Sequence, residues 1–199
     1  MIAIIDYGMG NLRSVLKAFE AVGSKAQITH KAEDILKADK VVLPGVGAMG
    51  PAMQKLQELS LISPIHQVIR EGKPFLGICL GLQLLFDKSS EGGFSEGLEV
   101  LQGDVERFSE LKVPHMGWNQ IKVQPAGNKM FQGLPPEENF YFCHSYFVKP
   151  RDVSIAAGIT LYGIDFVSAI VRDNIWGVQF HPEKSQKPGL QILKNFGEL

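Results

Sequence analysis

The sequence has few cysteines and no excess of either charge, and each shortage excludes a class of protein. Only two of the 199 residues are cysteine, so we expect no disulfide framework and two reduced thiols. Lys and Arg number 20, Asp and Glu number 21, and the two signs are interleaved along the chain. Because phosphate backbones require a basic stripe, we exclude nucleic acid as a partner.

The sequence also lacks long apolar runs and cofactor signatures. No run approaches the length that spans a bilayer, and the chain starts at Met1 without a cationic leader, so we expect a cytoplasmic protein with no membrane partner. Gly8 and Gly10 begin a dinucleotide-like pattern, but Arg13 replaces its third glycine, and we expect no cofactor and no metal. A hydrophobic content of 45% is enough for one core, so residues 1–199 are predicted to form a single domain.

The first half of the chain alternates short apolar runs with helical patterns. Ile2 to Ile5 is a continuous apolar run, which is typical of a parallel strand covered on both faces. A glycine-rich turn follows, and Asn11 is a candidate N-cap for a helix that ends at Gly23. The runs that repeat this alternation are Ala26 to Thr29, Val41 to Leu43, and Pro74 to Ile78, which leads into an expected helix from Leu80 to Phe86.

The second half is richer in short β-type runs. They are Ile121 to Val123, Asn139 to Phe142, Ile155 to Ala157, Val167 to Val171 and Ile175 to Phe180. Pro188 to Phe196 is expected to be a helix that packs on the sheet, and Glu91 to Gly97 a loop. The predicted fold class is α/β: an open, mostly parallel sheet with flanking helices and an antiparallel β-rich extension.

Gly77-Ile78-Cys79-Leu80-Gly81 places a cysteine at the junction of an apolar strand and an apolar helix. This is the pattern of a nucleophile elbow, in which a sharp turn lifts the central side chain above the sheet and larger neighbours would collide. The start of a helix also favours a thiolate over a thiol. A buried core cysteine is the alternative, but the elbow pattern favours a nucleophile. Cys143 has no such context, and we interpret it as structural.

A cysteine nucleophile needs a base, and His181 is the candidate. It follows the strand Ile175 to Phe180, and ligands bind at the carboxyl ends of strands in open parallel sheets. Glu183, two residues later, can lie on the same side and accept the ring N–H of His181. The alternative for these residues is a surface turn.

The other four histidines are weaker candidates for the base. His30 and His66 lie in polar stretches and are expected at the surface. The roles of His115 and His144 stay open. Unlike His181, neither is followed by a carboxylate two residues later. His144 directly precedes Ser145-Tyr146 and is a candidate for lining the pocket.

Hydrolysis of a carboxamide passes through a tetrahedral oxyanion, which needs N–H donors held in position beforehand. The N–H of Leu80, directly after the nucleophile, is one candidate. The backbone of Val46 or Gly47 is the second, because the loop ends another predicted strand and glycine permits unusual peptide orientations. The alternative is that this loop is only a tight turn.

Gly77 to Gln83 together with His181-Pro182-Glu183 resembles the class I, triad-type glutamine amidotransferase family, over nearly the whole chain. Four motifs are similar, more narrowly, to the glutaminase subunits of imidazole glycerol phosphate synthase. They are Asp6 to Asn11, Pro44 to Met49, Pro114 to Asn119 and His181 to Ser185.

This resemblance implies an activity and a partner. Glutamine would form a thioester with Cys79 and release ammonia, and water would then release glutamate. Gln83 would contact the substrate, unless it is an ordinary helix residue, and the Ser145-Tyr146 backbone would hold the substrate carboxylate. The ammonia would pass to a separate cyclase subunit, a (β/α)8 barrel, which makes imidazole glycerol phosphate and an aminoimidazole carboxamide ribotide in histidine biosynthesis.

The chain has no phosphate cradle or acceptor site of its own, so we expect a heterodimer in which the partner supplies them. Trp118 and Tyr141 are large aromatics beside motif loops, and Lys184 adjoins the triad, so these residues and Asn11 are the candidates for the partner face. Trp118 as plain core is the competing interpretation.

Three rival functions remain open from the sequence. The chain could be the glutaminase subunit of another amidotransferase, such as those of anthranilate, aminodeoxychorismate or pyridoxal phosphate synthesis. It could be a non-catalytic interaction subunit, although the intact Cys79, His181 and Glu183 disfavour this. It could also be a cysteine hydrolase that acts on peptides or esters.

Overall fold

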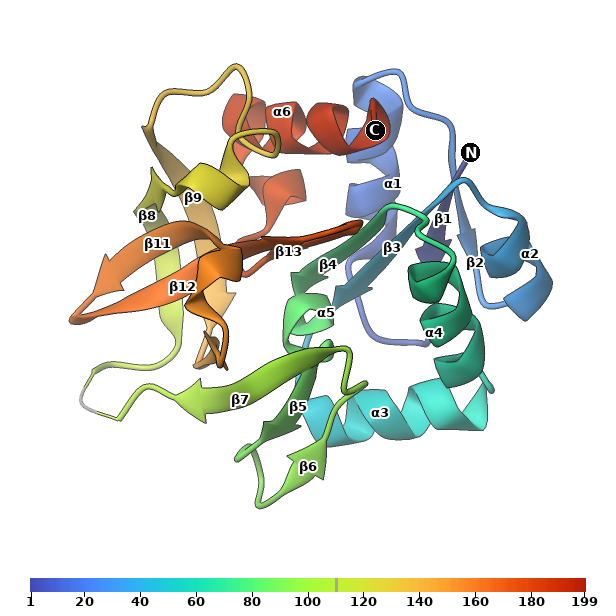
Figure 1. Ribbon diagram of the computed structural model, residues 1–199, viewed down its shortest axis with the longest axis horizontal. Coiled ribbons are helices and arrows are strands. Elements are labelled where there is room, and N and C mark those ends of the chain that lie inside the picture. The colour runs from blue at the N-terminus through green and yellow to red at the C-terminus, as the bar shows by residue number, and fades with distance from the viewer. Residues whose placement is uncertain (110) are drawn as a thin grey trace.

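A 13-stranded sheet runs through the residues that the structure describes, and it divides into a parallel and an antiparallel half (Figure 1). The structure is a computed structural model that describes residues 1–109 and 111–199. The strand order β2-β1-β3-β4-β13 forms the parallel half. These strands are β1 (Ile2–Ile5), β2 (Ala26–Thr29), β3 (Lys40–Gly45), β4 (Phe75–Cys79) and β13 (Ile175–Val178).

Helices cover both faces of the parallel half. On one face lie α1 (Leu12–Ala21) and α6 (Gln186–Gly197), whose Phe19 and Phe196 rings are 6.3 Å apart. On the other lie α2 (Ala32–Lys37), α3 (Met49–Glu58) and α4 (Ile62–Arg70). All four side chains of β1 are buried because Ala3 and Ile5 face one helix layer while Ile2 and Ile4 face the other.

The antiparallel half continues the sheet from β13 and carries a three-stranded flap that branches from β12. The sheet continues through β12 (Ile164–Arg172), β10 (Tyr146–Pro150), β7 (Leu101–Arg107), β5 (Phe86–Ser89) and β6 (Ser95–Glu96). The flap consists of β11 (Ala156–Tyr162), β8 (His115–Val123) and β9 (Glu137–His144). Pairing in this half is antiparallel except between β5 and β7. The predicted fold class and its antiparallel extension are confirmed.

Several predicted boundaries are wrong. The helix expected from Leu80 to Phe86 is a single turn, α5 (Leu80–Gln83), and Phe86 begins β5 by pairing with Leu101 of β7. A short apolar run in a sequence does not reveal whether it forms a helix or a strand. The expected loop Glu91 to Gly97 contains β6, and the strand expected at Ile155 starts one residue later, after the 3-10 turn Val153–Ile155.

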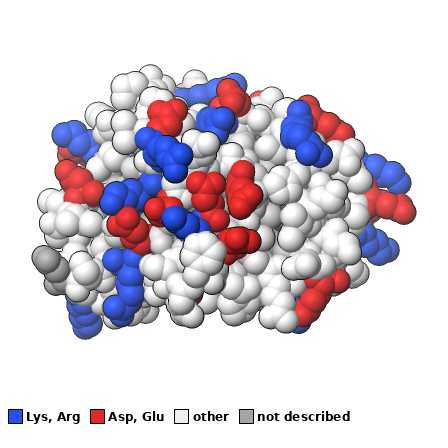
Figure 2. Space-filling model, turned by 60° about the horizontal axis from the view of Figure 1, so that its bottom comes forward, with Lys and Arg blue, Asp and Glu red and all other residues white. Residues whose placement is uncertain are grey.

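The surface of the described residues mixes both charges. On the face that Figure 2 brings forward, Lys and Arg side chains lie among Asp and Glu side chains. None of the helices in the described part of the chain has the length and apolarity that a bilayer crossing demands. His66, which we expected at the surface, is half-buried within α4, whereas His30 is exposed as expected.

Candidate active site

Cys79 lies at a sharp turn between β4 and α5. Its backbone has φ 54° and ψ −108°, in a region that residues other than glycine rarely adopt. Strained backbone of this kind concentrates at functional sites, where the surrounding structure enforces it. The turn that was predicted from the glycine spacing is therefore present, and it presents the sulfur at the carboxyl end of the parallel strands.

Gly77 and Gly81 are required by this turn. A Cβ at Gly77 would lie 2.7 Å from the carbonyl oxygen of Gly81, and a Cβ at Gly81 would lie 1.7 Å from the carbonyl oxygen of Leu43. Neither backbone group can move aside, because both belong to the sheet or to the elbow itself. The prediction that two glycines remove a steric clash is confirmed.

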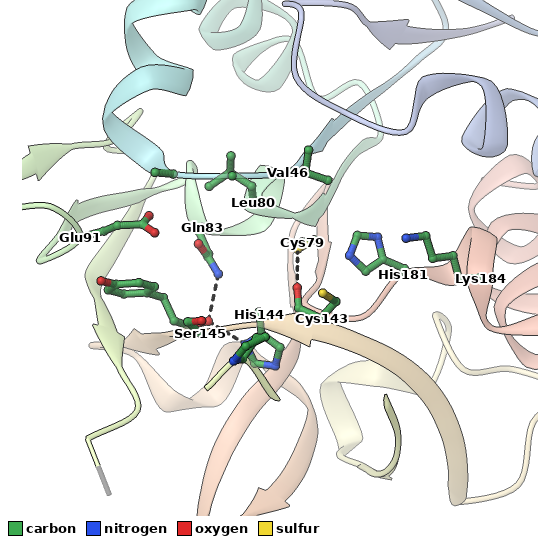
Figure 3. A pocket seen from close by; sticks show the side chains of 14 residues that line it. Val46, Cys79, Leu80, Gln83, Glu91, Cys143, His144, Ser145, His181 and Lys184 are labelled. Atoms are coloured by element: carbon green, nitrogen blue, oxygen red, sulfur yellow. Dashed lines mark hydrogen bonds between the residues drawn. The ribbon is translucent and has the colours of Figure 1, made fainter. Parts of the chain in front are cut away.

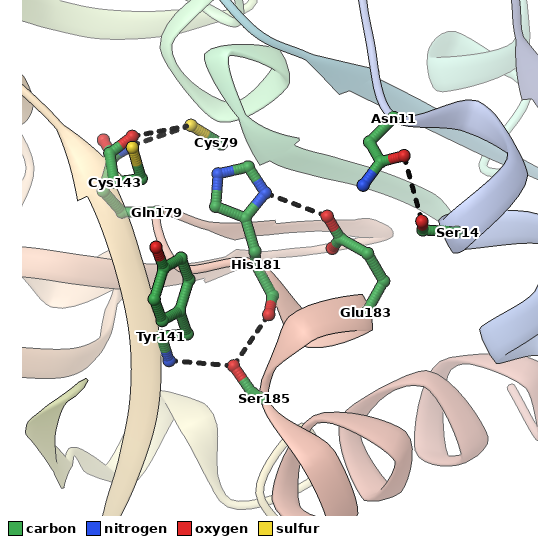
Figure 4. Close-up of polar contacts among 9 residues, drawn as sticks. All are labelled: Asn11, Ser14, Cys79, Tyr141, Cys143, Gln179, His181, Glu183 and Ser185. Carbon is green, nitrogen blue, oxygen red and sulfur yellow. Dashed lines mark hydrogen bonds and ion pairs between the residues drawn. The ribbon is translucent and has the colours of Figure 1, made fainter. Parts of the chain in front are cut away.

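His181 follows β13, the neighbour of β4, and its ring is oriented by Glu183. The Nδ1 atom of His181 lies 2.9 Å from Oε1 of Glu183, and the two side chains are only 5% and 1% exposed (Figure 4). The His181 backbone is held as well, because its N–H donates to the Tyr141 carbonyl at 2.9 Å and its carbonyl accepts from Ser185 Oγ at 2.7 Å. The other ring nitrogen faces the Cys79 sulfur.

The electrostatic surroundings of His181 favour its protonated form. Burial alone would lower its pKa, but the nearby Cys79 sulfur and Glu183 carboxylate outweigh burial and raise the pKa to about 10. The imidazole therefore holds its second proton between sulfur and carboxylate. A group in this state can give a proton to a leaving amine.

A cavity of about 400 Å³ opens above the sulfur and contains most of the predicted site residues (Figure 3). The residues that line it are Val46, Gly47, Ala48, Cys79, Leu80, Gln83, Glu91, Pro114, Cys143, His144, Ser145, Tyr146, His181 and Lys184. Thus the structure brings together the predicted triad, oxyanion candidates and substrate contacts, apart from Glu183, which lies behind His181. Among the described residues, no group of three or more His, Cys, Asp or Glu side chains could hold a metal ion.

The oxyanion candidates form one wall of this cavity. Gly47 has φ +91°, a conformation that favours glycine, and Val46 beside it is 42% exposed. Leu80 lies on the adjacent elbow and is buried. The loop therefore lies in the wall of the cavity that also contains the Cys79 sulfur.

Gln83 is fixed in the cavity wall rather than exposed on a helix. It is 4% exposed, and its Nε2 donates to the Tyr146 carbonyl and to Oε1 of Gln179, both at 3.0 Å. Gln179 was missed by the sequence reasoning. Its Nε2 lies 3.6 Å from the Cys79 sulfur. A single amide inside the apolar run of residues 175–180 was the signal that could have identified it.

The structure places two further residues in the cavity, Cys143 and Glu91. Cys143, interpreted as structural, lines the cavity, and its carbonyl oxygen is 4.0 Å from Sγ of Cys79. Both thiols are free. Glu91, from the segment expected to be only a loop, accepts a hydrogen bond from the Met49 N–H at 3.1 Å, at the start of α3. Burial raises the pKa of Glu91.

Three of the four candidates for a partner face, Trp118, Tyr141 and Lys184, lie together, and Lys184 also lines the cavity. Trp118 and Tyr141 meet edge to face with ring centroids 6.2 Å apart, and Nζ of Lys184 is 5.8 Å from the Tyr141 ring. Trp118 is 49% exposed, so its interpretation as plain core is wrong. Asn11 begins α1 as predicted, although its side chain does not cap the backbone and instead accepts from Ser14 Oγ at 2.9 Å.

Comparisons with known proteins agree with this geometry. The sequence profile of the family described as Glutamine amidotransferase class-I matches residues 3–198. The chain is 52% identical over 199 residues to the imidazole glycerol phosphate synthase subunit HisH of Moorella thermoacetica, covering 100% of this chain and 94% of that protein. It is 53% identical over 208 residues to the HisH subunit of Syntrophotalea carbinolica, with 100% of both chains covered.

Solved structures support the fold. A crystal structure of a glutamine amidotransferase superposes with a TM-score of 0.78 at 16% identity and covers 100% of both chains. The structure of PurLQS from Thermotoga maritima gives a TM-score of 0.76 at 16% identity, covering 98% of this chain and 96% of that one. At such low identity these two matches concern the fold alone. The family profile and the full-length relatives together establish that the chain belongs to the class-I glutamine amidotransferase family, in the branch of the HisH subunits of imidazole glycerol phosphate synthase.

Proposed function

We propose that this chain hydrolyses glutamine to glutamate and ammonia and supplies the ammonia to a cyclase subunit in histidine biosynthesis. The observation that carries the proposal is the position of the Cys79 sulfur, which lies on a strained elbow beside the His181–Glu183 pair and at the floor of a cavity. The full-length relatives are HisH subunits, which favours this assignment over anthranilate, aminodeoxychorismate or pyridoxal phosphate synthesis.

The chemistry has two balanced steps. In the first, the Cys79 sulfur attacks the side-chain carbonyl carbon of glutamine, the C–N bond breaks, and His181 gives its proton to the departing ammonia. In the second, His181 takes a proton from water, the resulting hydroxide attacks the thioester carbonyl, and glutamate leaves as the sulfur is restored. Glu183 keeps the imidazole oriented and stabilises its charged form.

The oxyanion of each tetrahedral intermediate needs two N–H donors. Leu80 N–H supplies the first, since it directly follows the nucleophile on the elbow. The peptide at Val46 or Gly47 supplies the second after a rotation, which the positive φ of Gly47 makes accessible. Gln83, on the same helical turn as Leu80, and the Ser145–Tyr146 backbone on the opposite wall hold the amino-acid end of the substrate.

The ammonia acceptor belongs to a partner subunit, which we propose to be a cyclase with a (β/α)8 barrel fold in a cytoplasmic heterodimer. Asn11, Trp118, Tyr141 and Lys184 form the surface for it. Support comes from the exposure of Trp118 and from Lys184, which both lines the cavity and lies over Tyr141. A partner docked there would cover the cavity mouth.

The test is steady-state glutamate production from glutamine by the purified chain, alone and reconstituted with its cyclase subunit. We expect glutamate in the complex and none with Cys79→Ala, which should still bind the cyclase. Cys143→Ala is the matched control and should retain activity. Turnover of γ-glutamyl esters or peptides instead of glutamine, or undiminished activity in Cys79→Ala, would overturn the proposal.

A further inference from the structure

Two buried histidines beside the cavity have no part in the chemistry above. His115 on β8 and His144 at the end of β9 are 3% and 6% exposed. Antiparallel pairing of the two strands places these residues opposite one another, and Nδ1 of His115 lies 2.9 Å from Nε2 of His144. Buried polar groups need hydrogen-bond partners, so the direction of each bond in this pair is worth deriving.

The Tyr146 carbonyl determines which nitrogen of His144 carries the proton. Nδ1 of His144 is 2.7 Å from that oxygen, and a carbonyl can only accept, so Nδ1 must donate. In a neutral ring Nε2 is then an acceptor, and its partner across 2.9 Å must be the donor. His115 therefore carries its proton on Nδ1, and its Nε2 is left as an acceptor.

Asn119 completes the chain at the other end. Its Nδ2 lies 3.1 Å from Nε2 of His115 and donates to the Leu161 carbonyl at 3.0 Å, while its Oδ1 accepts from the Gln120 N–H at 2.8 Å. Exchanging the nitrogen and oxygen of the Asn119 amide would break its hydrogen bonds to the Leu161 carbonyl and to the Gln120 N–H. Only one direction of donation, from Asn119 through His115 and His144 to Tyr146, satisfies every group.

The surroundings of both rings keep them neutral. His115 is stacked between Phe142 and Tyr162, with ring centroids 4.8 Å and 4.1 Å away, and His144 lies 5.5 Å from the Phe108 ring. Burial lowers the pKa of His115 to about 4 and that of His144 to about 3. Since the charged forms are disfavoured at neutral pH, the single direction of donation persists there.

This chain of bonds ends on the part of the cavity that faces the substrate. The Tyr146 carbonyl accepts from both His144 and Gln83, so both of its lone pairs are occupied. The neighbouring Ser145 carbonyl accepts from the Phe108 N–H at 3.2 Å. Because both carbonyls are hydrogen-bonded, the two peptides of this segment are held in one orientation.

We infer that His115 and His144 are positioning residues for glutamine: as a neutral relay anchored by Asn119, they lock the Ser145–Tyr146 backbone in the orientation that binds the amino-acid end of the substrate. This inference rests on the proposed function. The relay touches neither the sulfur nor His181, so its loss should weaken substrate binding and leave the chemical steps nearly intact.

The protonation state can be measured without any activity. We would record long-range ¹H–¹⁵N spectra of the ¹⁵N-histidine-labelled chain at pH 7 and assign the two rings with His115→Gln and His144→Gln. We expect both rings to be neutral with the proton on Nδ1. A proton on Nε2 in either ring, or a charged imidazole, would overturn the relay whether or not the chain is a glutaminase.

The functional arm compares two substitutions of the same residue in the complex with the cyclase. His144→Asn keeps a donor near the Nδ1 position, whereas His144→Gln places its amide near Nε2, where its carbonyl can still accept from His115, and leaves the Tyr146 carbonyl short of one bond. We expect His144→Gln to raise KM for glutamine about five- to tenfold, as loss of one such hydrogen bond implies, with kcat within about twofold. His144→Asn should stay within about twofold of wild type in both constants.

His66→Gln is the control, since α4 contributes no residue to the cavity, and it should leave KM unchanged. An equal rise of KM in both His144 variants would indicate lost packing and overturn the inference, as would a fall in kcat without a change in KM. Absence of glutaminase activity in the wild-type complex would refute the proposed function instead, and the spectra would still decide the relay.

Discussion

The two halves of the sheet contribute different things to the site. The parallel half supplies the groups to which we assign the chemistry, because Cys79 ends β4 and Val46 and His181 lie beyond the carboxyl ends of β3 and β13. The antiparallel half supplies the opposite wall, in which His144 and Tyr146 hold one another through hydrogen bonds. The first set is held by local backbone geometry and the second by long-range pairing of strands. Substitutions in the two halves should therefore fail in different ways.

The largest effect should come from removing the base in the parallel half. We expect His181→Ala to lower kcat by about three to four orders of magnitude, because neither proton transfer can then occur. Glu183→Gln should cost less, since an amide still orients the ring but does not stabilise its charge. Glutamate assays on the complex give both values. If His181→Ala kept near-normal activity, or if the two ranked the other way, the roles given to this pair would be wrong.

The raised pKa of His181 should also make stability depend on pH. The pKa of about 10 in the folded protein lies above the ordinary histidine value of 6.5, so the folded state binds the extra proton more tightly. The contribution of protonated His181 to the free energy of unfolding is fully present below about pH 6.5. It is lost as pH rises through about 10, which lowers the free energy of unfolding by roughly 2 to 4 kcal/mol. Urea unfolding at several pH values measures this. Glu183→Gln should flatten the decline, and an equally steep decline in that variant would contradict the assigned cause.

A smaller effect is expected at the Val46–Gly47 loop, which we propose rotates to complete the oxyanion site. Alanine at Gly47 would be strained at φ +91°, and its Cβ would lie 3.0 Å from Cε of Met9. We expect Gly47→Ala to reduce stimulation by the cyclase and its nucleotide ligand at least about tenfold while leaving cyclase binding intact. Gly72→Ala is the matched control, because Gly72 has φ +77°, an open Cβ position and no place in the cavity. Equal losses in the two variants would indicate general strain only.

The smallest effect concerns Tyr7, buried in the parallel half beneath the loop. Its hydroxyl has no hydrogen-bond partner among the residues that the structure describes, and burial raises its pKa. Tyr7→Phe should therefore leave the free energy of unfolding unchanged or raise it by up to about 1 kcal/mol. Tyr162→Phe, in the antiparallel half, should lower it by about 1 kcal/mol because that hydroxyl donates to the Lys112 carbonyl at 2.7 Å. Urea unfolding compares them, and a destabilised Tyr7→Phe would reveal a partner for its hydroxyl.

The sequence predicts the features of the parallel half of the sheet better than those of the antiparallel half. The β1 strand, the Gly77 and Gly81 elbow and the His181–Glu183 pair were predicted because each is encoded within a few neighbouring residues. The short extent of α5 was not, since Phe86 becomes a strand residue only through its pairing with β7.

The antiparallel wall depends on contacts that no local pattern contains. His115 and His144 meet only because β8 and β9 pair in one register across 29 positions of the chain. Gln179 reaches the sulfur from 100 positions away, and Cys143 enters the cavity through the same strand pairing. For that reason the sequence left the roles of the two histidines open and did not identify Gln179.

The proposed mechanism depends most on Cys79 as the residue that forms the thioester with the substrate. The direct measurement is peptide mass spectrometry of the cyclase complex, quenched in acid during turnover of glutamine. We predict one γ-glutamyl group on the peptide that contains Cys79, and no γ-glutamyl group on that peptide in Cys79→Ala. A γ-glutamyl group on Cys143, or continued turnover by Cys79→Ala without any adduct, would contradict it.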